Sequence, residues 1–153
     1  MVMTDLGLSP TKLKLYSWHK WLGVTIFALV LVRIVWRLSH VAPPLPPSMP
    51  AWQRQIAAGL HGLLYLLMLA LPLSGWLMSS AKGFQTVWFG VLPIPDLLGK
   101  NKETGDLLQS VHMSLNLLFV AVIAGHIGAA LKHHFIDKDD ILTRMLPDHA
   151  KEN

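Results

Sequence analysis

The sequence contains no cysteine among its 153 residues. This absence excludes disulfide bonds, thiolate metal ligands and thiol redox chemistry. The sequence also lacks any run of basic residues and any motif typical of RNA- or DNA-binding proteins, although its formal net charge is +4. We therefore expect no nucleic-acid partner, and lipid headgroups or an anionic substrate better explain the positive charge.

Charged residues are also scarce. They make up 14% of the sequence, against 52% for hydrophobic residues, whereas a soluble domain has about 25% charged residues. This deficit indicates a membrane protein. The N-terminal stretch lacks the apolar segment directly after a basic one, and the small-residue cleavage site, that a signal peptide has.

Three long apolar segments are present, at about residues 16–38, 56–78 and 107–132. Each exceeds the roughly 20 residues that a helix needs to cross the hydrocarbon core of a bilayer. None alternates with the period of two that is typical of strands. We predict an all-α integral membrane helical bundle with three transmembrane helices, in a single membrane-embedded domain over residues 1–153.

The two connections between these segments differ. The stretch "SHVAPPLPPSMPAWQRQ" is rich in proline and cannot continue a helix, so it predicts a stiff connector. The second connection carries Trp88 and Phe89, which suggests a loop at the membrane interface. Seven basic residues fall on the side of the proline-rich connector and the C-terminus, and six on the other side. This small excess favours a cytoplasmic C-terminus.

Ionisable side chains inside membrane spans are costly and therefore indicate function. His112 and His126 lie 14 residues apart in the third apolar segment, which is about 3.9 helical turns and about 21 Å of rise. They project from one face, near opposite sides of the membrane. His19 enters the first span on the side of His112, and His61 enters the second at a depth close to that of His126.

These positions form two layers, His19 with His112 and His61 with His126. Such layers suit two stacked haems, since iron held between two imidazoles serves electron transfer. Zinc prefers four ligands in one place and fits poorly. For any one of these histidines taken alone, a packed and hydrogen-bonded ring is the alternative.

Neighbouring residues could complete such a site. Gly23, one turn after His19, would let a flat macrocycle approach the helix, although close helix packing also uses glycine. Arg33 and Arg37 could pair with haem propionates, or they could reach lipid headgroups. His133 and His134 could deliver protons to a quinone, or could merely occupy a helix end that suits the macrodipole.

Three stretches closely resemble the bacterial cytochrome b561 family: "YSWHKWLGVTIFALVLVRIVWRL", "GLHGLLYLLMLALPLSGWLMSS" and "VHMSLNLLFVAVIAGHIGAALKHHFIDKDDILTRMLP". The family includes superoxide oxidase and is related to the b-haem subunits of hydrogenases and formate dehydrogenases. The resemblance implies that His19 matches a second-helix ligand, and that His112 and His126 match two fourth-helix ligands. It implies that His61 matches a third-helix histidine that is not usually axial.

The family normally has four helices and two b-haems, and this sequence resembles it from the loop after the first helix. We therefore expect a chain that lacks this helix, most simply through truncation. The haem between His19 and His112 is then complete. For His126, either its haem is absent, or His61 replaces the usual ligand, or another chain supplies one.

The resemblance implies a b-type cytochrome of the bacterial inner membrane, with one or two haems b. Such a protein moves electrons between a periplasmic donor, superoxide being one candidate, and the quinone pool. A superoxide:ubiquinone oxidoreductase is the enzymatic form of this expectation, and Lys82, Lys100 and Lys102 could attract the anion. The alternatives are an electron-transfer subunit of a dehydrogenase or hydrogenase complex, a homodimer that shares ligands, and a truncated, haem-poor membrane protein.

Overall fold

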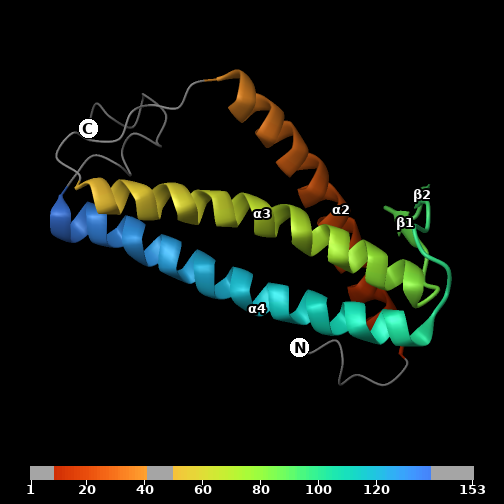
Figure 1. Ribbon diagram of the computed structural model, residues 1–153. Helices are drawn as coiled ribbons and strands as arrows, with labels where there is room; N and C mark the ends of the chain where they lie inside the picture. Colours follow the sequence, from red (N-terminus) through yellow and green to blue (C-terminus); the bar gives the residue numbers. More distant parts are fainter. Residues whose placement is uncertain (1–8, 41–49, 139–153) are drawn as a thin grey trace. The chain divides into compact units, whose positions relative to one another are not determined.

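The computed structural model describes residues 9–40 and 50–138. Three long helices dominate these residues: α2 (Pro10–Ser39), α3 (Ala51–Ala81) and α4 (Lys102–Lys132). The five-residue π-helix η1 (His133–Asp137) follows α4 directly. Figure 1 shows each long helix as a continuous ribbon, with a small hairpin in the segment between α3 and α4. Most of the proline-rich connector lies outside the described residues.

Each helix is long and apolar enough to cross a membrane, judged by its length and composition. Together they confirm the predicted all-α membrane bundle. Each helix begins five or six residues before the predicted apolar segment and ends within three residues of the predicted end. Local capping explains the extension of α2, where the Ser9 side chain accepts a hydrogen bond from the Lys12 backbone N–H at 3.2 Å and Pro10 occupies the first turn.

The helices bury few of their side chains within the chain. Val30, Leu67 and Ala81 are the buried hydrophobic residues of the described part. Large apolar side chains are instead exposed along the helices, for example Leu22, Val32 and Leu117. In water such surfaces would be strongly unfavourable, whereas a bilayer supplies the apolar surroundings that the chain itself does not.

The segment between α3 and α4 contains strands that the sequence pattern did not predict. Strand β1 (Thr86–Trp88) pairs antiparallel with β2 (Leu92–Ile94), with Val87 opposite Pro93. Phe89 and Gly90 make the turn with φ of 49° and 74°, a region that glycine adopts without steric cost. Strands of three residues are too short to show a period-two pattern, so the sequence indicated only a loop.

The described residues group into two compact units. The first unit comprises Met1–Ala42 and Tyr65–Asn116, and the second comprises Pro43–Leu64 and Leu117–Asn153, each as far as its residues are described. The first unit therefore holds α2, the second half of α3, the hairpin and the start of α4. The second unit holds the start of α3 and the end of α4.

Candidate haem sites

The first unit brings His19 of α2 together with His112 of α4. Their ring centres lie 6.1 Å apart and the ring planes are inclined by 84°. Two imidazoles bound to opposite sides of one metal ion, by bonds of about 2 Å, have ring centres roughly 6 Å apart. The observed separation therefore matches that of two axial ligands. His19 is exposed and His112 half-buried, so the pair is accessible from outside the unit.

The second half of α3 forms a wall beside His112. The Ser74 hydroxyl lies 2.9 Å from His112 Nδ1, and a Cβ added to Gly75 would lie 3.2 Å from His112 Cε1. Sequence reasoning did not identify these two residues. The sequence does show Ser74 and Gly75 shortly after Pro72. Nothing in the pattern indicates which histidine these two residues contact.

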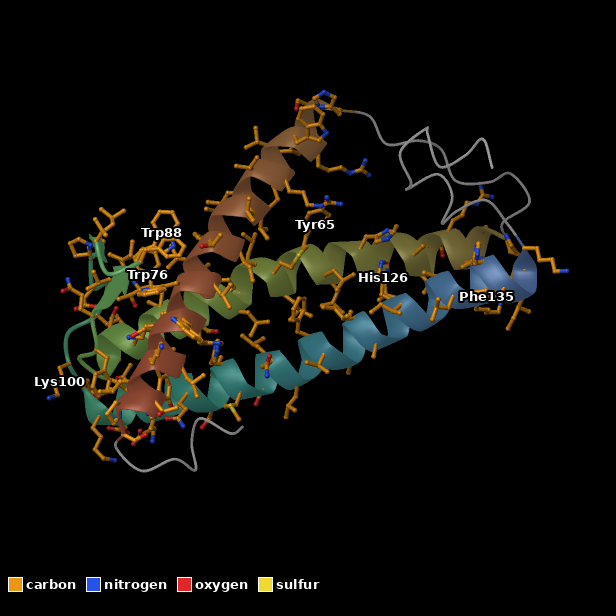
Figure 2. The ribbon with its side chains drawn as sticks, turned by 180° about the vertical axis from the view of Figure 1, so that it is seen from behind. Tyr65, Trp76, Trp88, Lys100, His126 and Phe135 are labelled. Atoms are coloured by element: carbon orange, nitrogen blue, oxygen red, sulfur yellow. The ribbon has the colours of Figure 1, made fainter. Side chains whose placement is uncertain are left out.

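The hairpin is attached to α2 next to His19. Lys20 Nζ donates to the Phe84 carbonyl at 2.8 Å, and Trp21 Nε1 donates to the Val87 carbonyl at 2.7 Å. Trp88 Nε1 donates in turn to Thr25 Oγ1 at 3.2 Å. Figure 2 shows Trp76, Trp88 and Lys100 at this end of the first unit. Direct neighbours of His19 along α2 thus hold the hairpin over this end of the site.

The lysines that could attract an anion are partly neutralised. Lys82 Nζ lies 3.3 Å from Asp106 Oδ1, and Lys102 Nζ lies 2.8 Å from Asp106 Oδ2. Lys82 also donates to the side-chain oxygen of Gln109. One aspartate therefore offsets part of the charge of two of the three lysines, which the sequence pattern did not reveal. Any attraction of anions at this end is weaker than the count of lysines suggests.

The second unit brings His61 of α3 together with His126 of α4. Their ring centres lie 5.4 Å apart with the planes inclined by 73°. Figure 2 shows the His126 side chain between α4 and α3. His61 is exposed and His126 half-buried. The arrangement resembles the first pair, with a separation slightly shorter than two axial ligands of one metal require.

The arginines and glycines have distinct surroundings. Arg33 Nε donates to the Tyr65 hydroxyl at 3.2 Å, and Arg37 lies exposed in the last turn of α2. A Cβ added to Gly23 would meet nothing within 4 Å. The face of α2 one turn from His19 is therefore open, as a flat ligand would need.

The end of α4 carries a small charged cluster within the second unit. Lys132 Nζ contacts both Asp137 carboxylate oxygens, at 2.9 and 2.6 Å. His133 Nδ1 lies 3.2 Å from Asp137 Oδ2. The hydrogen bonds of the π-helix η1 run from residue i to i+5, the spacing of Lys132 and Asp137, and π-helical turns occur frequently at functional sites.

The donor sets fit haem b. Among the described residues no three His, Cys, Asp or Glu side chains gather around one point, so each site offers two imidazoles, the number that a six-coordinate haem takes from the protein. With no cysteine in the sequence, the thioether attachment of c-type haem is excluded. His19 with His112 would hold such a group, and His61 with His126 offers a second place.

Membrane-crossing helices that carry facing histidines define a class of proteins, the multi-pass membrane cytochromes with b-type haem. The chain belongs to the prokaryotic cytochrome b561 family, whose model it matches over residues 1–148. It is therefore a bacterial multi-pass membrane protein with a function in electron transfer.

Curated relatives support this assignment. The chain is 38% identical to cytochrome b561 homolog 2 of Escherichia coli K12, over 94% of this chain and 81% of that protein. It is 34% identical to cytochrome b561 homolog 1 of the same organism, over 91% and 78%. It is 33% identical to a "probable superoxide oxidase CybB" of Yersinia pestis, over 82% of this chain and 70% of that protein.

Proposed function

We propose that the protein is an oxidoreductase that passes electrons from a periplasmic donor to the quinone pool. The observation that carries the proposal is the His19–His112 pair, with ring centres 6.1 Å apart. When bound there, haem would supply reversible one-electron chemistry at iron. His19 and His112 would hold the haem between two imidazoles, a ligand set that favours electron transfer over oxygen binding.

Superoxide is the candidate donor. The relative from Yersinia pestis is named as a probable superoxide oxidase, and Lys20 and Lys100 belong to the same unit as the histidine pair. Two superoxide anions would each lose one electron and leave as dioxygen. Those two electrons and two protons would convert one ubiquinone into ubiquinol, which balances the reaction.

The proposed protein lies in the inner membrane with its C-terminus on the cytoplasmic side. Protons for the quinone would enter from that side. The cluster of Lys132, His133 and Asp137 supports this role, because it combines an imidazole and a carboxylate 3.2 Å apart. His61 and His134 are further candidates for this proton transfer. Arg33 and Arg37 are proposed to contact the haem propionates.

The test is a kinetic measurement on the purified protein. After haem content is established from a reduced-minus-oxidised difference spectrum, superoxide is generated by pulse radiolysis in the presence of a soluble ubiquinone. We expect haem reduction followed by ubiquinol formation, and neither in His112→Ala. If superoxide leaves the haem of the wild-type protein oxidised, the proposed donor is wrong, although the protein can still transfer electrons from another source.

A subunit role is the second candidate function. The hairpin exposes apolar side chains, with Phe89 58% and Val91 83% exposed, and a redox partner could cover them. Isolation from native membranes in mild detergent distinguishes the two roles. A dehydrogenase or hydrogenase that co-purifies in stoichiometric amount supports the subunit, and a chain isolated alone or as a homodimer argues against it.

A further inference from the structure

Ser74 carries a buried hydroxyl that contacts His112 of the first pair. It lies in the second half of α3 and is 6% exposed. Its Oγ makes two contacts, one of 2.8 Å with the Leu71 carbonyl oxygen and one of 2.9 Å with His112 Nδ1. All three residues belong to the first unit.

The protons available on the Ser74 hydroxyl and the His112 ring determine which group donates each of these two hydrogen bonds. The Leu71 carbonyl can only accept, and the Ser74 hydroxyl has a single proton to give. Both contacts are hydrogen bonds only if Ser74 donates to Leu71 and accepts from His112. His112 then carries its proton on Nδ1. In a neutral imidazole this leaves Nε2 unprotonated, with the lone pair that a metal ion requires.

Gly75 fixes where the ring can lie. A Cβ at this position would be 3.2 Å from His112 Cε1, 3.5 Å from Nδ1 and 3.8 Å from Nε2. The ring edge that contains both nitrogens therefore packs against the α3 backbone. Ser74 and Gly75 together restrain both the position of the ring and the identity of the nitrogen that faces the hydroxyl.

We propose that Ser74 is a positioning residue that holds His112 in the Nδ1–H tautomer, with Nε2 prepared to ligate haem iron. The proposal rests on the proposed function, in which His112 is an axial ligand. Partners of this kind orient metal-bound histidines, raise their basicity and typically change metal affinity by about 10- to 100-fold. A serine oxygen is a weaker acceptor than a carboxylate, so we expect a loss near the lower end of that range.

A purely structural role for Ser74 makes different predictions. Serines inside helices often donate to a carbonyl one turn back simply to satisfy the hydroxyl. Ser80 donates in this way to the Trp76 carbonyl at 3.1 Å, and it also accepts from the Leu97 backbone N–H at 3.3 Å. Ser80 is also buried, at 2% exposure, and belongs to the same helix. It is the matched control, because removal of its hydroxyl changes α3 without touching His112.

The experiment compares wild type, Ser74→Ala, Ser74→Thr and Ser80→Ala. In haem-free protein labelled with ¹⁵N-histidine, NMR should show His112 as the Nδ1–H tautomer in wild type and Ser74→Thr, and a loss of that preference in Ser74→Ala. After haem is added, Ser74→Ala should bind it about tenfold more weakly. Its midpoint potential should rise, because a less basic imidazole stabilises oxidised iron less.

Two results would overturn the proposal: an Nε2–H tautomer in wild type, or a Ser74→Ala variant that matches Ser80→Ala in tautomer, affinity and potential. Failure of the proposed function looks different. If wild type binds no haem, or His112→Ala retains it all, His112 is not a ligand, yet the tautomer measured in haem-free protein still reports on Ser74.

Discussion

At the scale of residues, the first histidine pair depends on neighbours that have no redox chemistry of their own. His112 has a hydroxyl on one side at 2.9 Å and bare backbone at Gly75. His19 sits on an exposed face of α2 with open space one turn along, at Gly23. The pair therefore combines one tightly restrained ring with one accessible ring, which allows a large flat ligand to enter from the side of His19.

His112→Ala should remove the haem held in the first unit, because one imidazole cannot complete a six-coordinate site. Haem per protein should fall by one equivalent, measured from the b-type α-band of the reduced-minus-oxidised spectrum. His134→Ala is the control, since its ring contacts Phe135 and belongs to neither pair. Full haem content in His112→Ala would remove this residue from the ligand set.

Gly75→Ala should also weaken haem binding, although it changes no ligand. The added methyl would lie 3.2 Å from His112 Cε1, closer than ordinary contact, and overpacking of this kind costs about 1–3 kcal/mol. Haem titration of the purified variant measures the loss. Gly99→Ala, where an added Cβ meets nothing within 4 Å, should bind haem as wild type does. Equal affinity of the two variants would show that the ring can move away freely.

At the scale of elements, the hairpin is the part of the fold that depends most on specific polar contacts. Three side-chain hydrogen bonds, from Lys20, Trp21 and Trp88, connect it to α2. Its apolar side chains contribute little burial, since Phe84 and Phe89 are 65% and 58% exposed. The position of the hairpin beside His19 therefore follows from hydrogen bonds more than from packing.

Trp21→Phe should loosen the hairpin while leaving the haem site intact. It removes the donor to the Val87 carbonyl, a bond worth about 1 kcal/mol. Hydrogen–deuterium exchange of a peptide covering residues 84–92 should be faster, with haem content unchanged. Trp52→Phe, at the exposed start of α3, provides the comparison. An unchanged rate of hydrogen–deuterium exchange in Trp21→Phe would mean that the other contacts are enough to hold the hairpin against α2.

At the scale of the whole molecule, the number of haems decides how far electrons can travel through the chain. Each compact unit carries one pair of histidines, at 6.1 and 5.4 Å between ring centres. The resemblance of the sequence to the family implies that His61, alone of the four residues, matches a position that is not usually a ligand. The second pair is therefore where this protein would depart from its family.

His61→Ala should lower the haem-to-protein ratio from about two to about one, because a second haem needs both rings. Pyridine haemochrome absorbance against quantitative amino-acid analysis measures the ratio. The His112→Ala variant should lose the other equivalent, which makes the two losses additive. A wild-type ratio near one, unchanged in His61→Ala, would leave the second pair without a haem.

The chain should also have its C-terminus in the cytoplasm. The basis is the small excess of basic residues on that side, seven against six. A C-terminal green fluorescent protein fusion should fluoresce, and a C-terminal alkaline phosphatase fusion should be inactive. The opposite pair of results would place the cluster of Lys132, His133 and Asp137 on the periplasmic side and remove its role in cytoplasmic proton uptake.

The helices and the positions of the histidines along them could be predicted from the sequence, because both depend on local patterns. The length of the apolar segments predicts the three helices, and the periodicity of an α-helix places His112 and His126 on one face. The partnership of His19 with His112 was inferred from the depth at which each enters its helix. By contrast, the hairpin strands are too short to produce a pattern, and the shared use of Asp106 by two lysines depends on side-chain positions across a loop.

The sequence by itself determined that the chain crosses a membrane and that its spans hold histidines, because hydrophobicity and helical period are properties of consecutive residues. Only the tertiary structure decided which atoms meet. It brought the Ser74 hydroxyl and the bare backbone of Gly75 against His112. These contacts join α3 to α4 across 38 and 37 positions of the sequence, so they depend on how the helices pack, which no local pattern encodes.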